Sequence, residues 1–267
     1  MALAQRDGLS IYYEVAGTGP RLLVFNGSGS SIDALRWLMS LLTPHFTVLI
    51  HDQRGLGKTG LLGQSATPTM ADYALDAKAV LDAEGWDETA VFGMSFGGMV
   101  AQEFAVTWPE VVTRLALLCT SAGGAGGSSY PLHTLAELSA EERSRVAIHN
   151  LDMRFTPEWL RDHPNDQGLV DVMNAGSSHD KSDEVNRGEA AQLFARSSHD
   201  TWDRLHCISA PTLVAAGRYD GLAPLDNSET LAGVIPGAEL DVFEGGHLFI
   251  VQDPRALPRI IDHLLGH

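Results

Sequence analysis

Short, almost uninterrupted apolar runs recur along the chain and define its predicted strands. Runs of this kind are typical of parallel strands that are covered by helices on both faces. Ser10–Ala16 is different, because it alternates between apolar and polar residues and so predicts an edge strand. Ala238–Glu244 is a further candidate strand. The continuous runs are Arg21–Asn26, Phe46–Asp52, Thr89–Met94, Arg114–Thr120 and Pro211–Gly217.

Helical patterns lie between these strands. Ile32–Leu42 is one of them, and Gly98–Trp108 is another. The clearest is Thr69–Glu84, because Asp72 can complete a capping box at its start and Gly85 can end it. Strands that alternate with helices predict an α/β fold with a doubly wound, mostly parallel sheet and right-handed crossovers.

The alternation stops after Thr120. From Ser121 to about Leu205 the sequence contains a glycine-rich stretch and short helical patterns, but no convincing strand. We therefore expect a helical lid over residues 121–205, inserted into an α/β core of residues 1–120 and 206–267. The histidines of this segment lack the spacing of a metal site, so we expect them to be solvated or partly buried and predict no metal.

Composition and charge restrict the class of protein and of partner. The chain has 267 residues, of which 44% are hydrophobic, and a formal net charge of −16. Such a chain fits a folded domain with a modest insertion. Nucleic acids and anionic membranes require a cationic surface, so the sequence predicts neither as a partner. No apolar run approaches the roughly 20 residues that span a bilayer, and Met1–Gly8 lacks the features of a secretory signal.

Cysteine usage favours a reducing compartment. Cys119 and Cys207 are the two cysteines of the chain, a number that fits a cytoplasmic protein better than a disulfide framework. Cys119 falls within an apolar strand and is expected to be a small buried thiol. The sequence gives no indication of an oligomeric state.

Ser95 lies at the centre of a G-x-S-x-G pattern, between the strand Thr89–Met94 and the helix that follows. A sharp strand–turn–helix connection of this kind holds a serine hydroxyl clear of the sheet. The serine backbone is strained there, and its neighbours must be small. Gly93, Gly97 and Gly98 meet that need. The pattern therefore predicts a nucleophilic serine at position 95.

A nucleophilic serine needs a base that accepts its proton and an acid that orients the base. In this type of fold the acid and the histidine follow later strands, in that order. Asp220 follows the last strand but one, and His247 follows the last. We therefore predict a catalytic triad of Ser95, Asp220 and His247. Two alternative acids are less well placed, because Asp241 lies within a strand and Glu244 is too close in sequence to His247.

Acyl transfer also needs backbone N–H groups that stabilise the negative oxygen of the intermediate. We expect one donor to be the N–H of Phe96, the residue after the nucleophile. The loop after the strand Arg21–Asn26 should supply the other, and within it we favour the N–H of Ser28.

The sequence predicts no cofactor. Gly57-Lys58-Thr59 ends like a phosphate-binding P-loop, but Asp52 stands where that pattern requires a glycine. A helix should also follow directly, and the sequence after Thr59 predicts a loop. We therefore expect no nucleotide at this position.

These motifs together resemble the α/β-hydrolase superfamily. The resemblance implies an α/β-hydrolase fold and a cofactor-free serine hydrolase. We interpret Asp52 and Arg54 as structural residues that hold their loop, with a role in substrate binding as the alternative. The superfamily usually has His-Gly after the third strand, whereas this chain has Asn26-Gly27, where the asparagine could still hydrogen-bond the loop. Ser95–Gln102 looks most like compact esterases and 3-oxoadipate enol-lactonases. The matching segments are Asp52–Gly57, Gly93–Gly98, Gly217–Asp220 with Pro224, and Gly245–His247.

We therefore interpret the sequence as that of a serine hydrolase, which cleaves a small-molecule carboxylic ester or lactone through an acyl-enzyme on Ser95. A carbon–carbon bond hydrolase of the meta-cleavage type would use the same triad. A proline iminopeptidase is another alternative, with amine-binding carboxylates from Glu137, Glu141 or Glu142. The alternative that is not primarily an enzyme is a ligand-binding receptor that retains the triad and turns its ligand over slowly.

Overall fold

A single sheet of eight strands, in the order β1-β2-β4-β3-β5-β6-β7-β8, organises the molecule. The computed structural model describes residues 2–63, 67–177 and 182–267. β2 pairs antiparallel with β1 and with β4, and all the other pairs are parallel. The predicted α/β class with a mostly parallel sheet is therefore confirmed. The strands are β1 (Ala2–Arg6), β2 (Leu9–Ala16), β3 (Arg21–Phe25), β4 (Thr47–His51), β5 (Thr89–Met94), β6 (Val112–Leu118), β7 (Thr212–Gly217) and β8 (Glu239–Phe243).

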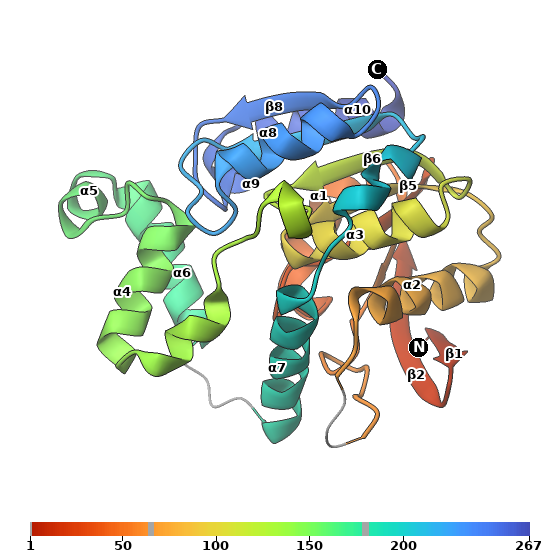
Figure 1. Cartoon of the computed structure of the whole chain (residues 1–267), viewed down its shortest axis with the longest axis horizontal. Coiled ribbons are helices and arrows are strands. Elements are labelled where there is room, and N and C mark those ends of the chain that lie inside the picture. Colours follow the sequence, from red (N-terminus) through yellow and green to blue (C-terminus); the bar gives the residue numbers. More distant parts are fainter. Residues whose placement is uncertain (1, 64–66, 178–181) are drawn as a thin grey trace.

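Helices cover both faces of this sheet (Figure 1). Successive residues of a strand point to opposite faces, and in β3 Leu23 and Phe25 enter one core while Leu22 and Val24 enter the other. α2, α3 and α8 pack on the first core, and α1, α9 and α10 on the second. The helices are α1 (Arg36–Leu42), α2 (Met70–Glu84), α3 (Phe96–Thr107), α4 (Ala140–Leu151), α5 (Pro157–Asp162), α6 (Pro164–Ser177), α7 (Asp183–Ser197), α8 (Leu225–Val234), α9 (Phe249–Gln252) and α10 (Ala256–Leu265).

The predicted start and end of α2 are confirmed. Thr69 Oγ1 accepts a hydrogen bond from the N–H of Asp72, and the Asp72 carboxylate accepts one from the N–H of Thr69 at 2.9 Å. Gly85 ends the helix in the left-handed region, with φ of 69°. Each cap satisfies backbone groups that a helix end leaves without a partner.

One expectation about the elements is wrong, and two predicted helices are present with different bounds. Ser10–Ala16 belongs to β2 and is not an edge strand. β1 pairs antiparallel with β2 and is itself the edge strand of the sheet. The apolar pattern of β1 is weak, since Leu3 is 52% exposed and Ala4 is its buried residue. The helix predicted over Ile32–Leu42 begins as a 3₁₀ turn at Asp33–Leu35, and the helix predicted from Gly98 already begins at Phe96.

The segment between β6 and β7 contains α4–α7, as the sequence predicted for a helical insertion. Among the described residues of this segment, strand-like pairing is limited to one isolated bridge between Gly123 and Asp200. Figure 1 shows α4–α6 grouped beside the sheet domain. α7 approaches the core closely, since a Cβ on Gly188 would lie 2.0 Å from the carbonyl oxygen of Gly55. The division into core and lid stays a prediction at this point.

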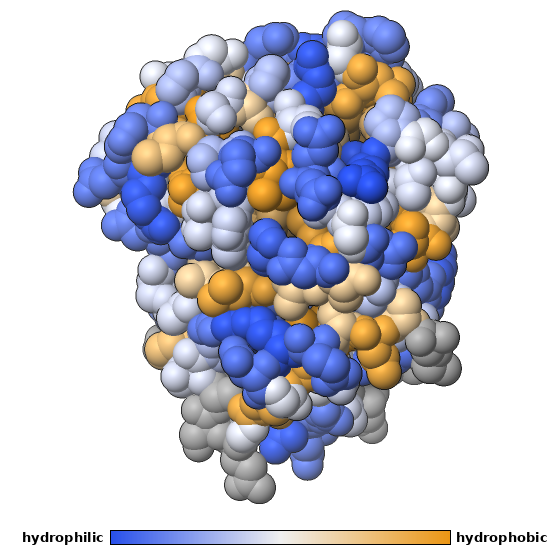
Figure 2. Space-filling view, turned by 90° about the vertical axis from the view of Figure 1, so that its right-hand side faces the viewer, coloured by the Kyte–Doolittle hydropathy of each residue, from blue (hydrophilic) through white to orange (hydrophobic). Residues whose placement is uncertain are grey.

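The face turned away from α4–α6 is mostly polar, with apolar side chains in small patches between charged ones (Figure 2). Scattered apolar side chains are normal on a folded protein and do not mark a binding surface. Within the described parts of the chain, no helix has the length and apolarity needed to cross a membrane.

Candidate active site

Ser95 occupies the sharp turn between β5 and α3, with φ of 56° and ψ of −118°. Such backbone angles cost a residue with a side chain about 1–3 kcal/mol, so surrounding contacts must hold them. The N–H of Ser95 donates to the carbonyl of Leu118 at 2.9 Å, and Thr120 Oγ1 donates to the carbonyl of Ser95 at 2.9 Å. Strand β6 and the residues after it therefore fix the turn.

The turn tolerates only small neighbours, as predicted. A Cβ on Gly97 would lie 2.2 Å from the carbonyl oxygen of Phe25, and a Cβ on Gly93 would lie 2.6 Å from the Cβ of Ala101. A Cβ on Gly98 would meet the side chain of Thr120 at 2.7 Å. Helix α3 can pack this close to the sheet because these three positions are glycines.

The structure brings Ser95, His247 and Asp220 together. His247 Nε2 lies 2.9 Å from Ser95 Oγ, and His247 Nδ1 lies 2.7 Å from Asp220 Oδ2. The other carboxylate oxygen of Asp220 accepts hydrogen bonds from the N–H groups of Leu222 and Ala223, both at 2.8 Å. The Asp220 side chain is fully buried, and that of His247 is 11% exposed. With Nδ1–H donated to the carboxylate, Nε2 is left to accept the serine proton.

The two alternative acids are engaged elsewhere. Asp241 pairs with Arg259 at 2.7 Å, and Glu244 pairs with Arg218 at 3.0 Å. Asp220 is therefore the acid that the fold presents to His247.

The end of α4 supports the loop that carries His247, a contact that no sequence pattern predicts. The N–H of His247 donates to the carbonyl of Leu151 at 2.6 Å. The side chain of Gln252 accepts from the N–H of Gly246 and donates to Asp152, both at 2.9 Å. The position of the imidazole thus depends on residues of the segment between β6 and β7.

The two backbone donors expected for an oxyanion belong to segments that lie next to Ser95. Phe96 is the first residue of α3, where a helix leaves N–H groups without an intrahelical partner. Ser28 lies in the loop of residues 26–30, called here the oxyanion loop, and a Cβ on Gly27 would lie 3.8 Å from Ser95 Cβ. Neither the N–H of Phe96 nor that of Ser28 donates to an acceptor within residues 2–63, 67–177 and 182–267.

A chain of side-chain amides fixes the oxyanion loop. Gln192 of α7 accepts from the N–H of Gly29 at 2.8 Å and donates to Gln53 at 2.6 Å. Gln53 in turn donates to the carbonyl of Asn26 at 3.0 Å. Asn26 hydrogen-bonds the loop as expected, because its Nδ2 donates to the carbonyl of Ser30. Glutamines are common and have no motif at this spacing, so sequence reasoning missed Gln53 and Gln192.

Cys119 lies beside the acid and the imidazole, and the ligand-type atoms of Cys119, Asp220 and His247 are within 4.8 Å of one another. Burial, followed by the charge of Asp220, raises the pKa of the Cys119 thiol well above its ordinary value, which keeps it protonated. Both ring nitrogens of His247 already have hydrogen-bond partners. The donor set therefore suits proton transfer better than metal binding.

Asp52 and Arg54 make internal contacts. The carboxylate of Asp52 accepts from the N–H groups of Ile32 at 2.7 Å and Lys58 at 2.8 Å. Arg54 binds both oxygens of Asp76 at 2.7 Å. These contacts hold the loop after β4, in agreement with the expected structural role of both residues.

Comparison with known proteins identifies the family. A family model described as serine aminopeptidase, S33, matches residues 20–249, which is most of the chain. The chain belongs to the α/β-hydrolase superfamily.

Relatives of this α/β-hydrolase include enzymes that act by hydrolysis. It is 31% identical over 252 residues to a poly(3-hydroxyalkanoate) depolymerase of Ectopseudomonas oleovorans, covering 90% of this chain and 82% of the relative. It is 25% identical over 251 residues to 3-oxoadipate enol-lactonase 2 of Acinetobacter baylyi, covering 92% and 88%. A crystal structure of a hydrolase from Pseudomonas aeruginosa PA01 matches 100% of this chain and 98% of its own, with a TM-score of 0.78 and 27% identity. The protein is therefore a hydrolase with the α/β-hydrolase fold.

Proposed function

We propose that this hydrolase cleaves a carboxylic ester or lactone of a small molecule through an acyl-enzyme on Ser95. The observation that carries the proposal is the continuous hydrogen-bonded path from Ser95 Oγ through His247 to Asp220, at 2.9 and 2.7 Å. Its geometry meets the distances that nucleophilic catalysis by serine requires.

The first half of the reaction forms the acyl-enzyme. Ser95 Oγ attacks the carbonyl carbon while its proton moves to His247 Nε2, and the buried Asp220 carboxylate stabilises the resulting imidazolium. The N–H groups of Phe96 and Ser28 hold the negative carbonyl oxygen, each contributing about 3–4 kcal/mol by analogy with measured donors. Collapse of the intermediate expels the alcohol, which takes the proton from His247. In a lactone the alcohol stays attached to the acyl group.

The second half releases the acid. His247 removes a proton from water, and the hydroxide attacks the ester carbon of acylated Ser95. The same two N–H groups hold the second oxyanion. Proton return from His247 to Ser95 Oγ frees the carboxylic acid and restores the enzyme.

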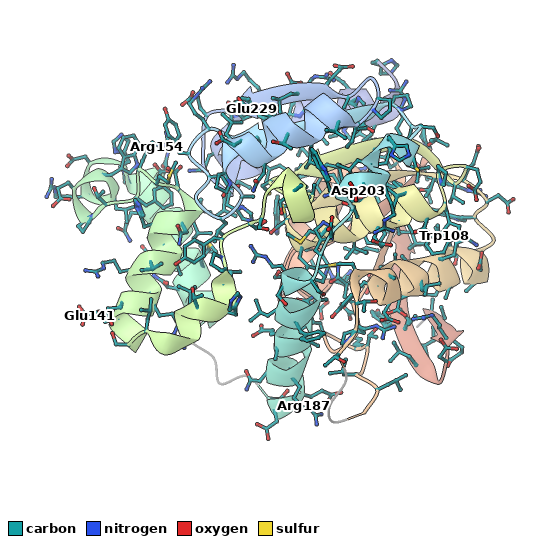
Figure 3. The ribbon with its side chains drawn as sticks, in the orientation of Figure 1. Trp108, Glu141, Arg154, Arg187, Asp203 and Glu229 are labelled. Carbon is teal, nitrogen blue, oxygen red and sulfur yellow. The ribbon has the colours of Figure 1, made fainter. Side chains whose placement is uncertain are left out.

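An aminopeptidase is less well supported, although the family model carries that description. An amine-binding site needs a carboxylate near the scissile bond. Glu142 hydrogen-bonds Ser139 at the start of α4, and Glu141 projects from the outer side of that helix (Figure 3). The side chain of Glu137 lies outside the described part of the structure. Two of the three candidate carboxylates thus have positions that do not support amine binding.

Two further features belong to the same proposal. Residues 121–205 are proposed as a lid on a core of residues 1–120 and 206–267, and contacts from Gln192 and Leu151 to the active-site loops support this division. The compartment is proposed to be the cytoplasm, since Cys119 and Cys207 are both free thiols.

The test combines turnover with covalent labelling. Wild-type protein, Ser95→Ala and the exposed-serine control Ser10→Ala are assayed on p-nitrophenyl esters of increasing acyl length. Intact mass is then measured after exposure to a fluorophosphonate. We expect turnover and a single adduct in wild type and Ser10→Ala, and neither in Ser95→Ala.

Other outcomes separate the alternatives. An adduct without turnover of these esters would favour a lactone within the proposed function, or one of the alternatives: carbon–carbon bond cleavage, a peptide substrate or slow-turnover ligand binding. Failure of both readouts in wild type would contradict a serine nucleophile.

A further inference from the structure

A cavity of about 210 Å³ is lined by residues that neighbour the turn at Ser95. Met99 and Ser121 line it together with Arg196 of α7. Met99 is one helical turn after Ser95, and its N–H donates to the Ser95 carbonyl at 3.3 Å. Ser121 directly follows Thr120, whose hydroxyl donates to the same carbonyl. The volume is below that of a pocket for drug-sized ligands and fits a short substrate group.

Arg196 brings a positive charge to this cavity without a paired carboxylate. Its Nη2 donates to the carbonyl of Tyr130 at 3.0 Å, and it forms no ion pair with any described residue. None of the described residues that line the cavity is Asp or Glu. A guanidinium carries five N–H donors, so most of its hydrogen-bonding capacity is left for a ligand.

Burial makes this charge costly in the absence of an anion. Desolvation lowers the pKa of Arg196 to about 10, against a smaller opposing effect of the Asp220 charge. The group nevertheless stays charged near neutral pH. A half-buried guanidinium without a directly paired carboxylate is stabilised by a bound anion, because the anion accepts its remaining hydrogen bonds and replaces lost hydration.

A series of hydrogen bonds connects Arg196 to Asp220. Tyr130, which accepts from Arg196, donates its own N–H to the carbonyl of Leu222 at 2.7 Å. The N–H of Leu222 donates to Asp220 at 2.8 Å. Tyr130 and Leu222 therefore connect the guanidinium of Arg196 to Asp220. These contacts hold the guanidinium in a defined position relative to the triad.

His199 lines the same cavity but adds no charge. Its ring is 7% exposed, and its Nε2 lies 3.1 Å from the carbonyl of Ser121, so Nε2 carries the proton. Burial lowers the pKa of His199 to about 4, which keeps the ring neutral. The expectation of solvated or partly buried histidines in this segment is wrong for His199. The fixed charge at this end of the cavity thus comes from Arg196.

We propose that Arg196 binds a free carboxylate of the substrate, so that the protein prefers esters or lactones that carry a second, anionic group. The inference rests on the proposed function and narrows its substrate class. A carboxylate matches the planar donor fork of arginine and can accept two parallel hydrogen bonds from it. The recognised group lies in the cavity, and the ester carbonyl lies at Ser95.

The kinetic test uses monomethyl and dimethyl glutarate, which have the same chain and differ in one free carboxylate. We expect Arg196→Gln to lower kcat/KM for monomethyl glutarate by about 10–100-fold, the range for a charged hydrogen-bonded contact. The value for dimethyl glutarate should change less than about threefold. Arg196→Lys should recover part of the loss, since lysine restores the charge without the planar donor fork of arginine.

Arg187→Gln is the matched control, because Arg187 is exposed near the other end of α7 and points away from the core (Figure 3).

A binding test keeps the inference independent of turnover. Calorimetric titration of Ser95→Ala with glutarate should show binding that disappears in Ser95→Ala/Arg196→Gln and persists in Ser95→Ala/Arg187→Gln. Equal loss on both esters, with a lowered Tm, would show a structural role for Arg196 and overturn the inference. Absence of any carboxylate preference in turnover and in binding would also overturn it, while Ser95-dependent hydrolysis of neutral esters would leave the proposed function standing.

Discussion

The side-chain amide of Gln192 donates a 2.6 Å hydrogen bond to Gln53, which lies 139 residues earlier in the chain. The same glutamine accepts from the backbone of the oxyanion loop at Gly29. One side chain of α7 therefore connects the proposed lid, the loop after β4 and the loop that should hold the oxyanion. Such a connection couples the geometry of the catalytic site to a segment distant in sequence.

Replacing Gln192 should impair chemistry more than binding. In Gln192→Ala the N–H of Gly29 loses its acceptor, and the oxyanion loop can shift away from Ser95. Because a misplaced oxyanion donor loses stabilisation of the transition state, we expect kcat to fall about 10–100-fold with KM changed less than about threefold. Steady-state kinetics on a p-nitrophenyl ester measure both parameters.

Gln167→Ala is the matched control, because Gln167 lies on α6 and hydrogen-bonds Asp171 at the surface. Its kcat should stay within about twofold of wild type. Gln192→Glu can still accept from Gly29 but cannot donate to Gln53, so its kcat should lie between those of Gln192→Ala and wild type. Equal kcat values in all four proteins would show that the amide chain does not position the loop.

The sequence allowed the strands and the ends of α2 to be predicted because their signals are local. Continuous apolar runs mark strands that are buried on both faces, and capping residues satisfy backbone groups of their own helix. β1 was missed for the opposite reason. Its single buried side chain, Ala4, makes no periodic pattern, and pairing with β2 stabilises it.

The residues of the triad were accessible to sequence reasoning because each follows a recognisable strand. The contacts of Gln192, Leu151 and Arg196 with the active-site region were not, since they depend on how the segment between β6 and β7 folds back on the sheet. Long-range packing of this kind leaves no fixed spacing in the sequence. The proposed substrate preference thus depends on the part of the chain with the weakest sequence signals.

The proposed role of Asp220 as the acid of the triad can be tested against Asp241 of β8 by a pair of isosteric variants. Asp220→Asn keeps the shape but removes the charge that stabilises the imidazolium and selects its tautomer, so kcat should fall about 10³–10⁴-fold. Asp241→Asn weakens the contact with Arg259 and should leave kcat within about twofold. Both are measured by ester hydrolysis at constant pH, and a larger loss in Asp241→Asn than in Asp220→Asn would reverse the assignment.

Stability should fall as the solution is acidified from about pH 6.5 towards about pH 4. Burial lowers the pKa of His51 and of His199 to about 4 in the folded protein, against about 6.5 in an unfolded chain. Between these two pKa values the unfolded state binds more protons than the folded state. The free energy of unfolding therefore increases as pH rises through this range and decreases as pH falls. Each histidine accounts for up to about 3 kcal/mol of this loss.

Urea unfolding between pH 4.5 and 7.5 measures the slope. His199→Gln keeps a donor for the carbonyl of Ser121 but cannot be protonated, so its free energy of unfolding should depend less on pH than that of wild type. His45→Gln is the control, because His45 is exposed, and its slope should match wild type. Parallel slopes for His199→Gln and wild type would contradict the buried neutral state of this ring.

The same substitution should have opposite effects on stability at two glycines. In Gly97→Ala the new methyl group would lie 2.2 Å from the carbonyl oxygen of Phe25, a backbone atom that can yield only if α3 moves away from β3. We expect a loss of about 3 kcal/mol or more in the free energy of unfolding, at the upper end for overpacking, together with loss of esterase activity because Ser95 directly precedes the same helix. Gly168 lies inside α6, and a Cβ there meets nothing within 4 Å. Gly168→Ala should therefore raise the free energy of unfolding by about 0.5–1 kcal/mol and leave activity unchanged. Urea unfolding compares the two variants, and tolerance of alanine at Gly97 would show that α3 does not pack on β3 as closely as the turn at Ser95 requires.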